Sequence, residues 1–208
     1  LALLLITLGN LTWNQGPVYK NSFSLWSDTI KKNPNAWMAH TNLGNILVRD
    51  NKIEEAIACF RNAIKANPEY LLAHNNLGRA LSDSGKPDEA ALHYRTAIRI
   101  KPDYAETHHN FANTLAKYNK FEEAIIHYRE AIKIQPYYAD AHYNFANTLT
   151  QHNKFEEAII HYRTAIRIKP DEQAHNNLGI LLKNNGEFKK AITHFRMAIN
   201  INPKFSLA

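Results

Sequence analysis

The sequence predicts an all-α solenoid made of tandem helix–turn–helix repeats. Six of the eight prolines lie at regular intervals, four of 34 residues and then one of 33: Pro34, Pro68, Pro102, Pro136, Pro170 and Pro203. A fixed period of this length is typical of one structural unit that is copied and stacked. Within each period, apolar residues recur at helical spacing and small residues recur at fixed places. Each unit can then bury its apolar face against its neighbours, so the chain needs no central core.

The period from Ala139 to Asp171 shows how each repeat divides into two helices. Its first half carries four residues at i, i+3, i+4 and i+7, which form one face of a helix: His142, Phe145, Ala146 and Leu149. This helix is predicted to end near Asn153. The corresponding places in the other repeats hold only Asn or Gly, the residues that best tolerate a left-handed conformation after a helix: Asn51, Gly85, Asn119 and Gly186.

A second helix is predicted from about Lys154 to Ile168, and Pro170 ends it because the residue before a proline avoids helical geometry. Small residues recur on the first helices (Gly44, Gly78, Ala112, Ala146, Gly179) and on the second (Ala56, Ala90, Ala124, Ala158, Ala191). They allow the two backbones to approach closely. Aromatic side chains fill the remaining volume: Phe60, Tyr94, Tyr128, Tyr162 and Phe195.

These features together resemble the tetratricopeptide repeat (TPR) family, from about Trp37 to Pro203. The resemblance implies antiparallel helix pairs wound into a right-handed superhelix, with the first helices lining a concave groove. It divides the chain into an apolar segment (1–16), an N-terminal partial repeat or cap (17–36), four repeats (37–70, 71–104, 105–138 and 139–172), and a fifth repeat with a short tail (173–208). The fifth repeat begins one residue short, so a distorted junction is expected near Gln173.

The N-terminal run LALLLITL is too short to cross a bilayer, which takes about 20 apolar residues. Because the sequence begins at Leu1 rather than Met, the run is interpreted either as the end of a membrane or signal segment or as a capping helix. The first interpretation places the protein at a membrane or outside the cytoplasm, and the second in the cytoplasm. The following segment, from about Val18 to Pro34, resembles a lone second helix with Trp26 at the aromatic place.

A polar stripe runs beside the buried stripe of each first helix. Its most regular member is one Asn per repeat: Asn42, Asn76, Asn110, Asn144 and Asn177. A partial second row (Asn45, Asn113, Asn147), Arg79 and Tyr143 complete the predicted peptide-binding groove. An amide both donates and accepts hydrogen bonds, so it can pair with a peptide group whatever side chains the peptide carries. The row resembles the asparagine ladder of O-GlcNAc transferases; alternatively, each Asn bridges adjacent first helices.

Histidine recurs twice per repeat, in the first helices (His40, His74, His108, His142, His175) and in the second helices (His93, His127, His161, His194). A metal site needs several imidazoles around one ion, whereas successive copies of one position lie a repeat apart. We therefore predict no metal site and expect packed or hydrogen-bonded histidines. If several of these rings are buried and neutral, acid should destabilise the array.

Several other functions are disfavoured by the sequence. The carboxylate clamp of chaperone-binding TPR domains needs Lys and Arg at places that here hold Thr41, Asn75, Glu106 and Asn110. Nucleic acid is not an expected partner, because the basic residues late in each second helix are matched by acidic residues early in it, as the helix dipole favours. No enzyme signature is present, so we predict no catalytic residue and no cofactor.

The sequence therefore predicts a non-enzymatic scaffold that binds an extended peptide or protein segment in an Asn-lined groove. Two alternatives stay open. The N-terminal stretch LALLLITLGNLTW, with the residues up to Pro34, resembles the junction of multi-spanning glycosyltransferase-like proteins that carry TPRs. An apolar start and an end without a polar capping helix also suit head-to-tail self-assembly into oligomers or filaments.

Overall fold

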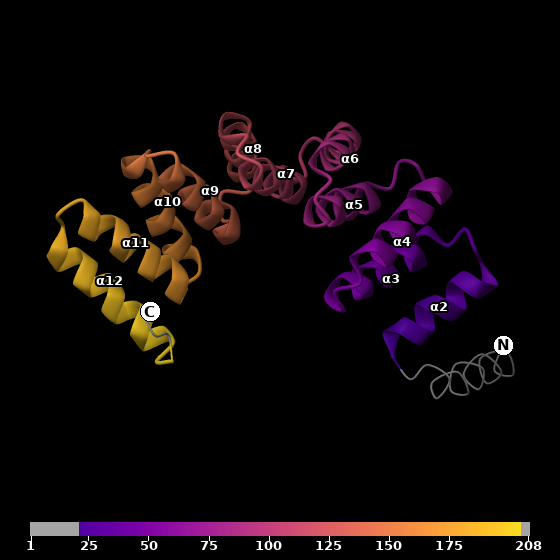
Figure 1. Cartoon of the computed structure of the whole chain (residues 1–208), viewed down its shortest axis with the longest axis horizontal. Coiled ribbons are helices and arrows are strands. Elements are labelled where there is room, and N and C mark those ends of the chain that lie inside the picture. Colours follow the sequence, from indigo (N-terminus) through magenta and orange to yellow (C-terminus); the bar gives the residue numbers. More distant parts are fainter. Residues whose placement is uncertain (1–20, 205–208) are drawn as a thin grey trace, which may run out of the picture. The chain divides into compact units, whose positions relative to one another are not determined.

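The computed structural model describes residues 21–204, and every regular element among them is an α-helix. The first helices of the five repeats are α3 (Trp37–Arg49), α5 (Leu71–Asp83), α7 (Ala105–Lys117), α9 (Ala139–Gln151) and α11 (Glu172–Asn184). The second helices are α4 (Ile53–Ala66), α6 (Pro87–Ile100), α8 (Phe121–Ile134), α10 (Phe155–Ile168) and α12 (Phe188–Ile201), and α2 (Ser22–Lys32) precedes them all. The predicted all-α array of helix pairs is thereby confirmed (Figure 1).

The described chain forms two compact units. The first unit, up to Ile100, holds α2 to α6, and the second, from Lys101 onward, holds α7 to α12. The predicted apolar segment 1–16 lies outside the described residues. None of the described helices combines the length and the hydropathy that a bilayer-spanning segment requires.

The turns between paired helices confirm the role predicted for Asn and Gly. Five residues after the first helices have positive φ: Asn51, Asn119, Asn153, Gly85 and Gly186, with φ between 58° and 79°. The left-handed residue reverses the chain, so that the next backbone N–H bonds back into the helix end. One such bond runs from the N–H of Lys154 to the carbonyl of Leu149 at 2.8 Å. This closure satisfies carbonyls that the helix leaves without partners.

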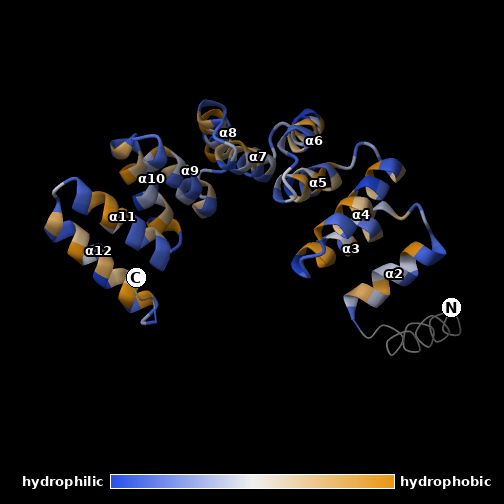
Figure 2. Cartoon of the chain, viewed as in Figure 1, coloured by the Kyte–Doolittle hydropathy of each residue, from blue (hydrophilic) through white to orange (hydrophobic). Residues whose placement is uncertain are grey.

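Close backbone approach inside each pair explains the small residues of the first helices. A Cβ added to Gly44 would lie 2.5 Å from the Phe60 ring, and one added to Gly179 would lie 2.6 Å from the Phe195 ring. The recurring alanines of the second helices are buried too, and Ala124 and Ala158 are fully buried. Apolar and polar residues alternate along the helices as this one-sided burial requires (Figure 2).

Successive repeats within a unit pack through the second helix of one and the first helix of the next. The ring of Tyr128 on α8 stacks on the ring of Phe145 on α9, with centroids 5.3 Å apart and planes 21° apart. Both side chains are buried. The N-terminal partial repeat joins in the same manner, because α2 packs against α3.

The junction before the fifth repeat differs from the others, as its shorter sequence predicts. In place of the usual turn, Asp171 is extended and caps α11 by accepting hydrogen bonds from the N–H groups of Gln173 and Ala174, at 3.0 and 2.9 Å. The change stays local to the connection. Farther along α11, Asn177 still reaches α9, so the row of asparagines continues through the fifth repeat.

Candidate functional site

The predicted asparagine row lies on the first helices, and all five of its members are partly exposed. In the second unit, two of them bridge adjacent first helices. The Asn177 amide on α11 donates to the Asn147 side-chain oxygen at 3.1 Å and to the Tyr143 hydroxyl at 3.2 Å, both on α9. The Asn144 amide on α9 donates to Nε2 of His109 on α7 at 3.0 Å. These bonds fix the orientation of the amides.

The first unit repeats this arrangement once. The Asn76 amide on α5 donates to the side-chain oxygen of Asn45 on α3 at 2.9 Å. Asn42 lies on α3 in the first unit, and Asn110 lies on α7 in the second. The structure therefore gives Asn76, Asn144 and Asn177 a bridging role between repeats. Asn76 and Asn144 each use one N–H for the bridge, whereas Asn177 donates to two partners. Whether the row also binds a peptide stays a prediction.

The second asparagine row has a local cause that sequence reasoning did not reveal. The Tyr128 hydroxyl donates to the Asn113 side-chain oxygen at 2.6 Å, and the Tyr162 hydroxyl donates to that of Asn147 at the same distance. A buried tyrosine hydroxyl needs an acceptor, and a first-helix Asn supplies it. In the third and fourth repeats, the tyrosine of the second helix and the second-row Asn of the first helix therefore form a hydrogen-bonded pair.

His109, which the sequence analysis did not single out, forms hydrogen bonds with three polar residues. Its Nε2 accepts from the amides of Asn113 and Asn144, at 3.1 and 3.0 Å, and its Nδ1 lies 3.1 Å from the Tyr138 hydroxyl. Because Nε2 faces two donors, the neutral ring carries its proton on Nδ1 and donates to Tyr138. Burial lowers the pKa of His109, although Asp140 and Glu106 act against that shift.

Arg79 and Tyr143, the remaining residues of the predicted groove, lie in different surroundings. Arg79 is exposed on α5, at the place where repeats one, three and four carry the second-row Asn. The Tyr143 hydroxyl donates to the side-chain oxygen of Gln173 at 3.4 Å while it accepts from Asn177. Tyr143 therefore ties α9 to the start of α11.

A pocket of about 490 Å³ opens between the fourth and fifth repeats, and its lining residues are all uncharged. Its apolar lining comes from Phe155, Tyr162, Ile180 and Leu181, and its amide lining includes Asn147, Gln151, Asn177 and Asn184. The predicted groove included Asn147 and Asn177 but neither Phe155 nor Ile180. The sequence held a signal for Ile180, which stands where repeats one, three and four carry the second-row Asn.

The recurring histidines pair across each helix pair, as expected for packed and hydrogen-bonded rings. Their Nδ1 atoms approach to 3.1 Å in His74–His93 and His108–His127, and to 2.9 Å in His142–His161 and His175–His194. In the second to fourth repeats, Nε2 of the first-helix ring lies about 3 Å from a proline carbonyl, for example that of Pro136. A carbonyl only accepts, so this nitrogen carries the proton and the partner's Nδ1–H donates to the first-helix Nδ1.

The first repeat keeps the contact between Nε2 of His40 and the carbonyl of Pro34, at 2.9 Å, but lacks the histidine pair. Cys59 occupies the place of the second histidine, and Nδ1 of the buried His40 has no hydrogen-bond partner among the described residues. Burial, with a smaller contribution from Glu55, raises the pKa of the Cys59 thiol. Within the part of the chain that the structure covers, no three or more His, Cys, Asp or Glu side chains are placed to hold a metal ion.

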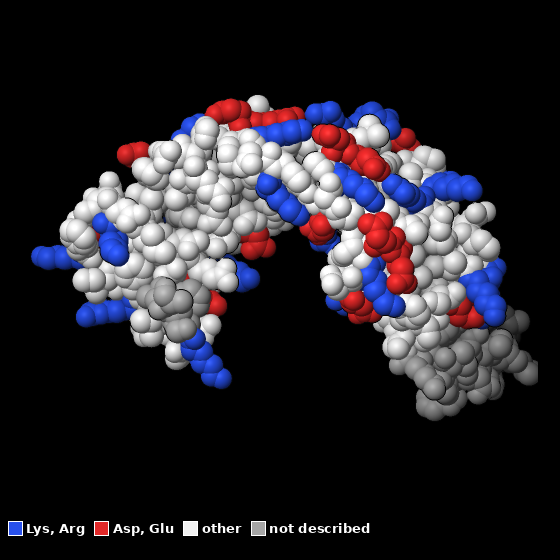
Figure 3. Space-filling model, viewed as in Figure 1, with Lys and Arg blue, Asp and Glu red and all other residues white. Residues whose placement is uncertain are grey.

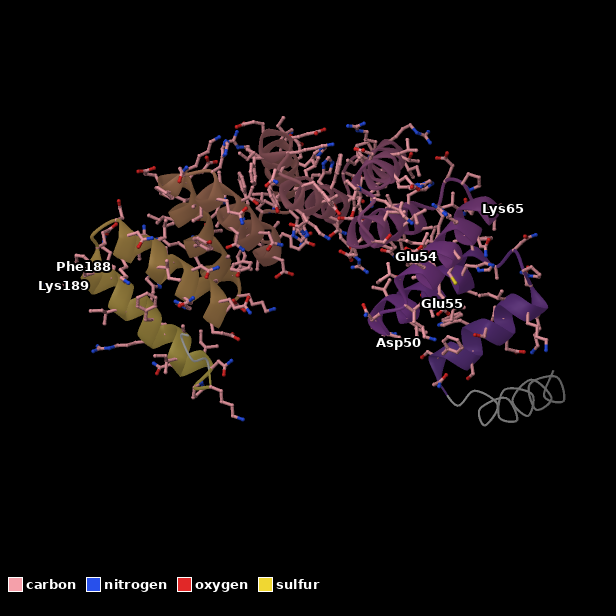
Figure 4. The ribbon with its side chains drawn as sticks, in the orientation of Figure 1. Asp50, Glu54, Glu55, Lys65, Phe188 and Lys189 are labelled. Atoms are coloured by element: carbon pink, nitrogen blue, oxygen red, sulfur yellow. The ribbon has the colours of Figure 1, made fainter. Side chains whose placement is uncertain are left out.

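In the second helices from α4 to α10, acidic residues lie early and basic residues lie late. Figure 4 labels Glu54 and Glu55 in the first turn of α4 and Lys65 in its last turn, the order that the helix dipole favours. Ion pairs also join consecutive second helices, between Arg61 and Glu89 at 3.0 Å and between Arg129 and Glu157 at 2.9 Å. In Figure 3 acidic and basic side chains accordingly lie beside one another.

Family comparisons identify the repeat. Models of the tetratricopeptide repeat match residues 41–105 and 173–205, and a TPR repeat model matches residues 112–152 and 146–186. Together these matches cover most of the chain. A search of the curated proteins finds no match to this sequence.

Solved structures of TPR proteins share the fold. A structure of MamA is 23% identical, covers 78% of this chain and 95% of its own, and superposes with a TM-score of 0.70. PilF of Pseudomonas aeruginosa is 21% identical, with coverage of 79% and 76% and a TM-score of 0.75. YrrB, described as a TPR protein with an unusual peptide-binding site, is 19% identical, with coverage of 86% and 93% and a TM-score of 0.64. The helix pairs, their glycine and asparagine turns, and the matching repeat models establish that the chain belongs to the tetratricopeptide repeat family.

Proposed function

We propose that this chain is a protein-interaction scaffold whose first-helix surface binds an extended peptide or protein segment along the asparagine row. The observation that carries the proposal is the fixed orientation of the amides. Asn144 and Asn177 are held by the repeat before them, at 3.0 Å from His109 and 3.1 Å from Asn147, and both remain partly exposed. Groups held in place lose little side-chain entropy on binding, which favours affinity.

The chemistry of the row suits a peptide backbone. Asn144 uses one N–H for its bridge and keeps a second N–H and an acceptor oxygen, the complement of a peptide group, while Asn177 keeps its acceptor oxygen. Because each repeat carries one such Asn, successive repeats can offer the same kind of hydrogen bond to successive peptide groups of an extended ligand. A similar fold, YrrB, is described as having a peptide-binding site, which supports this use of the surface.

A substitution experiment tests the proposal. The full chain would be panned against a displayed random-peptide library, and the selected peptides would be measured by fluorescence polarisation. Replacing Asn110, Asn144 and Asn177 together by Ala should weaken binding at least tenfold while helicity is retained, since each lost hydrogen bond contributes about 1 kcal/mol. The matched control is Asn62→Ala with Asn200→Ala, which removes exposed amides from second helices.

The two variants must also be compared for folding, because the row bridges repeats. Circular dichroism and thermal melts of both would identify a loss of structure. Binding that is equal in the triple variant, the control and the unmodified chain would contradict the proposal.

Self-assembly is a second candidate, which one observation on α12 favours. Phe188 and Ile192 of α12 are 62% and 50% exposed, whereas their counterparts on α10, Phe155 and Ile159, are 40% and 9% exposed. The stripe that α11 covers on α10 is therefore open on α12 among the described residues; Figure 4 labels Phe188 at its start. A second copy of the chain is one occupant for this stripe.

Light scattering across a concentration series tests this candidate. The average molar mass should rise with protein concentration for the unmodified chain. Ile192→Glu should abolish this rise, because a carboxylate would be buried at the contact between copies. A monomer at every concentration would exclude self-assembly.

A further inference from the structure

The pocket between α9, α10 and α11 is distinct from the rest of the asparagine-lined surface. Phe155 and Ile180 form its exposed apolar walls, at 40% and 44% exposure. Leu181 and the ring of Tyr162 lie deeper and are buried. Exposed apolar side chains next to buried ones give the pocket an apolar concave surface, and covering such a surface with an apolar group is favourable in water.

The polar groups at the base of this pocket are satisfied by one another. The Asn147 side-chain oxygen accepts from both the Tyr162 hydroxyl at 2.6 Å and the Asn177 amide at 3.1 Å. The Thr150 hydroxyl donates to the carbonyl of Ala146 at 2.8 Å. The base therefore makes few demands on a ligand, and an apolar group can enter without leaving these atoms unpaired.

A comparison with the preceding repeat shows that the apolar character is specific to this place. The corresponding pocket between the third and fourth repeats has about 540 Å³ and is lined by Asn147 and Lys117, at the places of Ile180 and Gln151. A charged side chain and an amide there replace a neutral amide and an aliphatic wall. The second unit thus offers one apolar pocket beside a polar one.

We infer that the pocket lined by Phe155, Ile180 and Leu181 binds one large uncharged apolar side chain, aromatic or aliphatic, of a peptide segment that lies along the asparagine row. The lining carries no charge, so a charged side chain would lose its hydration without a compensating ion pair. Gln151 and Asn184 are exposed at the rim, where their amides can bond to the peptide backbone on either side of the anchoring residue. The inference rests on the proposed peptide-binding function and adds the class of residue that sets specificity.

Ile180→Asn is the sharpest test, because it installs the residue that repeats one, three and four carry at this place. The first repeat already combines such an Asn, Asn45, with Phe60, as the variant would combine it with Phe195. The probe is a fluorescent peptide selected from the displayed library on the full chain. Ile160→Asn is the matched control, since Ile160 lies on α10 and is 60% exposed outside the pocket.

We expect the selected peptides to share a large apolar residue, and Ile180→Asn to weaken their binding about tenfold while Ile160→Asn leaves it unchanged. Replacing the shared apolar residue of the peptide by Ala should weaken binding to the unmodified chain to a similar extent. Ile180→Asn combined with the altered peptide should weaken binding no more than either change alone, because both remove the same contact. The peptide-side change keeps the test valid even if Ile180→Asn lowers the melting temperature.

Fully additive losses, or binding indifferent to Ile180→Asn, would overturn the inference. If Asn110→Ala with Asn144→Ala still weakened binding in that case, the proposed groove would stand without the apolar pocket. Binding that is indifferent to all of these changes would overturn both.

Discussion

Acidification from pH 7.5 to 5.5 should destabilise the folded chain, and the histidine pairs give the physical reason. Each pair shares one hydrogen bond between two Nδ1 atoms, as in His142–His161 at 2.9 Å, which requires one nitrogen without a proton. Burial first, and then the partner ring, lowers the pKa of His93 and of His161 to about 4. Both values lie below the pKa of about 6.5 of an unfolded histidine.

The sign and the pH window follow from these values. The unfolded chain takes up protons at about pH 6.5 while the folded rings remain neutral, so the stabilisation is complete above pH 6.5. It is lost as the pH falls from about 6.5 towards about 4. The pKa values of His142, His175 and His194 are also lowered, chiefly by burial, and act in the same direction.

The size of the effect at pH 5.5 can be worked from the two values near 4. Holding one such ring neutral one pH unit below its unfolded pKa costs about 1.4 kcal/mol, so His93 and His161 together give about 2.8 kcal/mol. Both rings are partly exposed, and solvent screening reduces this sum to about 1.5 kcal/mol. A change of that size lowers the melting temperature of a chain of this length by about 3–6 °C.

Thermal melts followed by circular dichroism at the two pH values provide the measurement. His161→Cys, which copies the His40–Cys59 arrangement of the first repeat, should reduce the acid-induced loss. His152→Gln is the control, because the partly exposed His152 bonds Glu122 at 2.8 Å and belongs to no histidine pair. A melting temperature of the unmodified chain that is the same at pH 7.5 and 5.5 would refute the reasoning.

Three further predictions concern stability and are measured by urea denaturation. Asn177→Ala removes two hydrogen bonds between α9 and α11 and should cost about 1 kcal/mol, whereas Asn42→Ala, at the start of the row, should cost less; equal losses would contradict the bridging role. Ala124→Leu should overpack a fully buried contact by about 1–3 kcal/mol, and the exposed Ala58→Leu serves as its control, so equal effects would count against the packing argument. Asn153→Val places a β-branched residue at φ 58° and should cost at least about 1 kcal/mol, while Asn153→Gly should be nearly neutral; a neutral valine would show that the turn adapts.

The periodicity predicted most of the helical framework, because its causes are local. A left-handed turn restricts the residue to Asn or Gly, so the spacing alone was enough to assign Asn51, Asn119 and Asn153 to the turns. The small residues likewise followed from close backbone approach, as the distance from Gly44 to the Phe60 ring shows.

The candidate site was less predictable, because it depends on which residues of different repeats meet. The spacing placed the asparagines in a row, but it could not tell that Asn144 would reach His109 or that Asn113 would accept from Tyr128. The histidine pairs were expected only as packed or hydrogen-bonded rings. Their partners became specific once the helix pair brought His142 and His161 together.

The sequence by itself determined the repeat, its helices and its turns, because each depends on propensities that act over a few residues. Only the tertiary structure decided which amides are occupied by bridges and where an apolar pocket opens. Phe155 and Ile180 are 25 positions apart in the chain. They line one cavity because α10 and α11 pack side by side, and packing of this kind is set by the fit of whole surfaces rather than by local sequence.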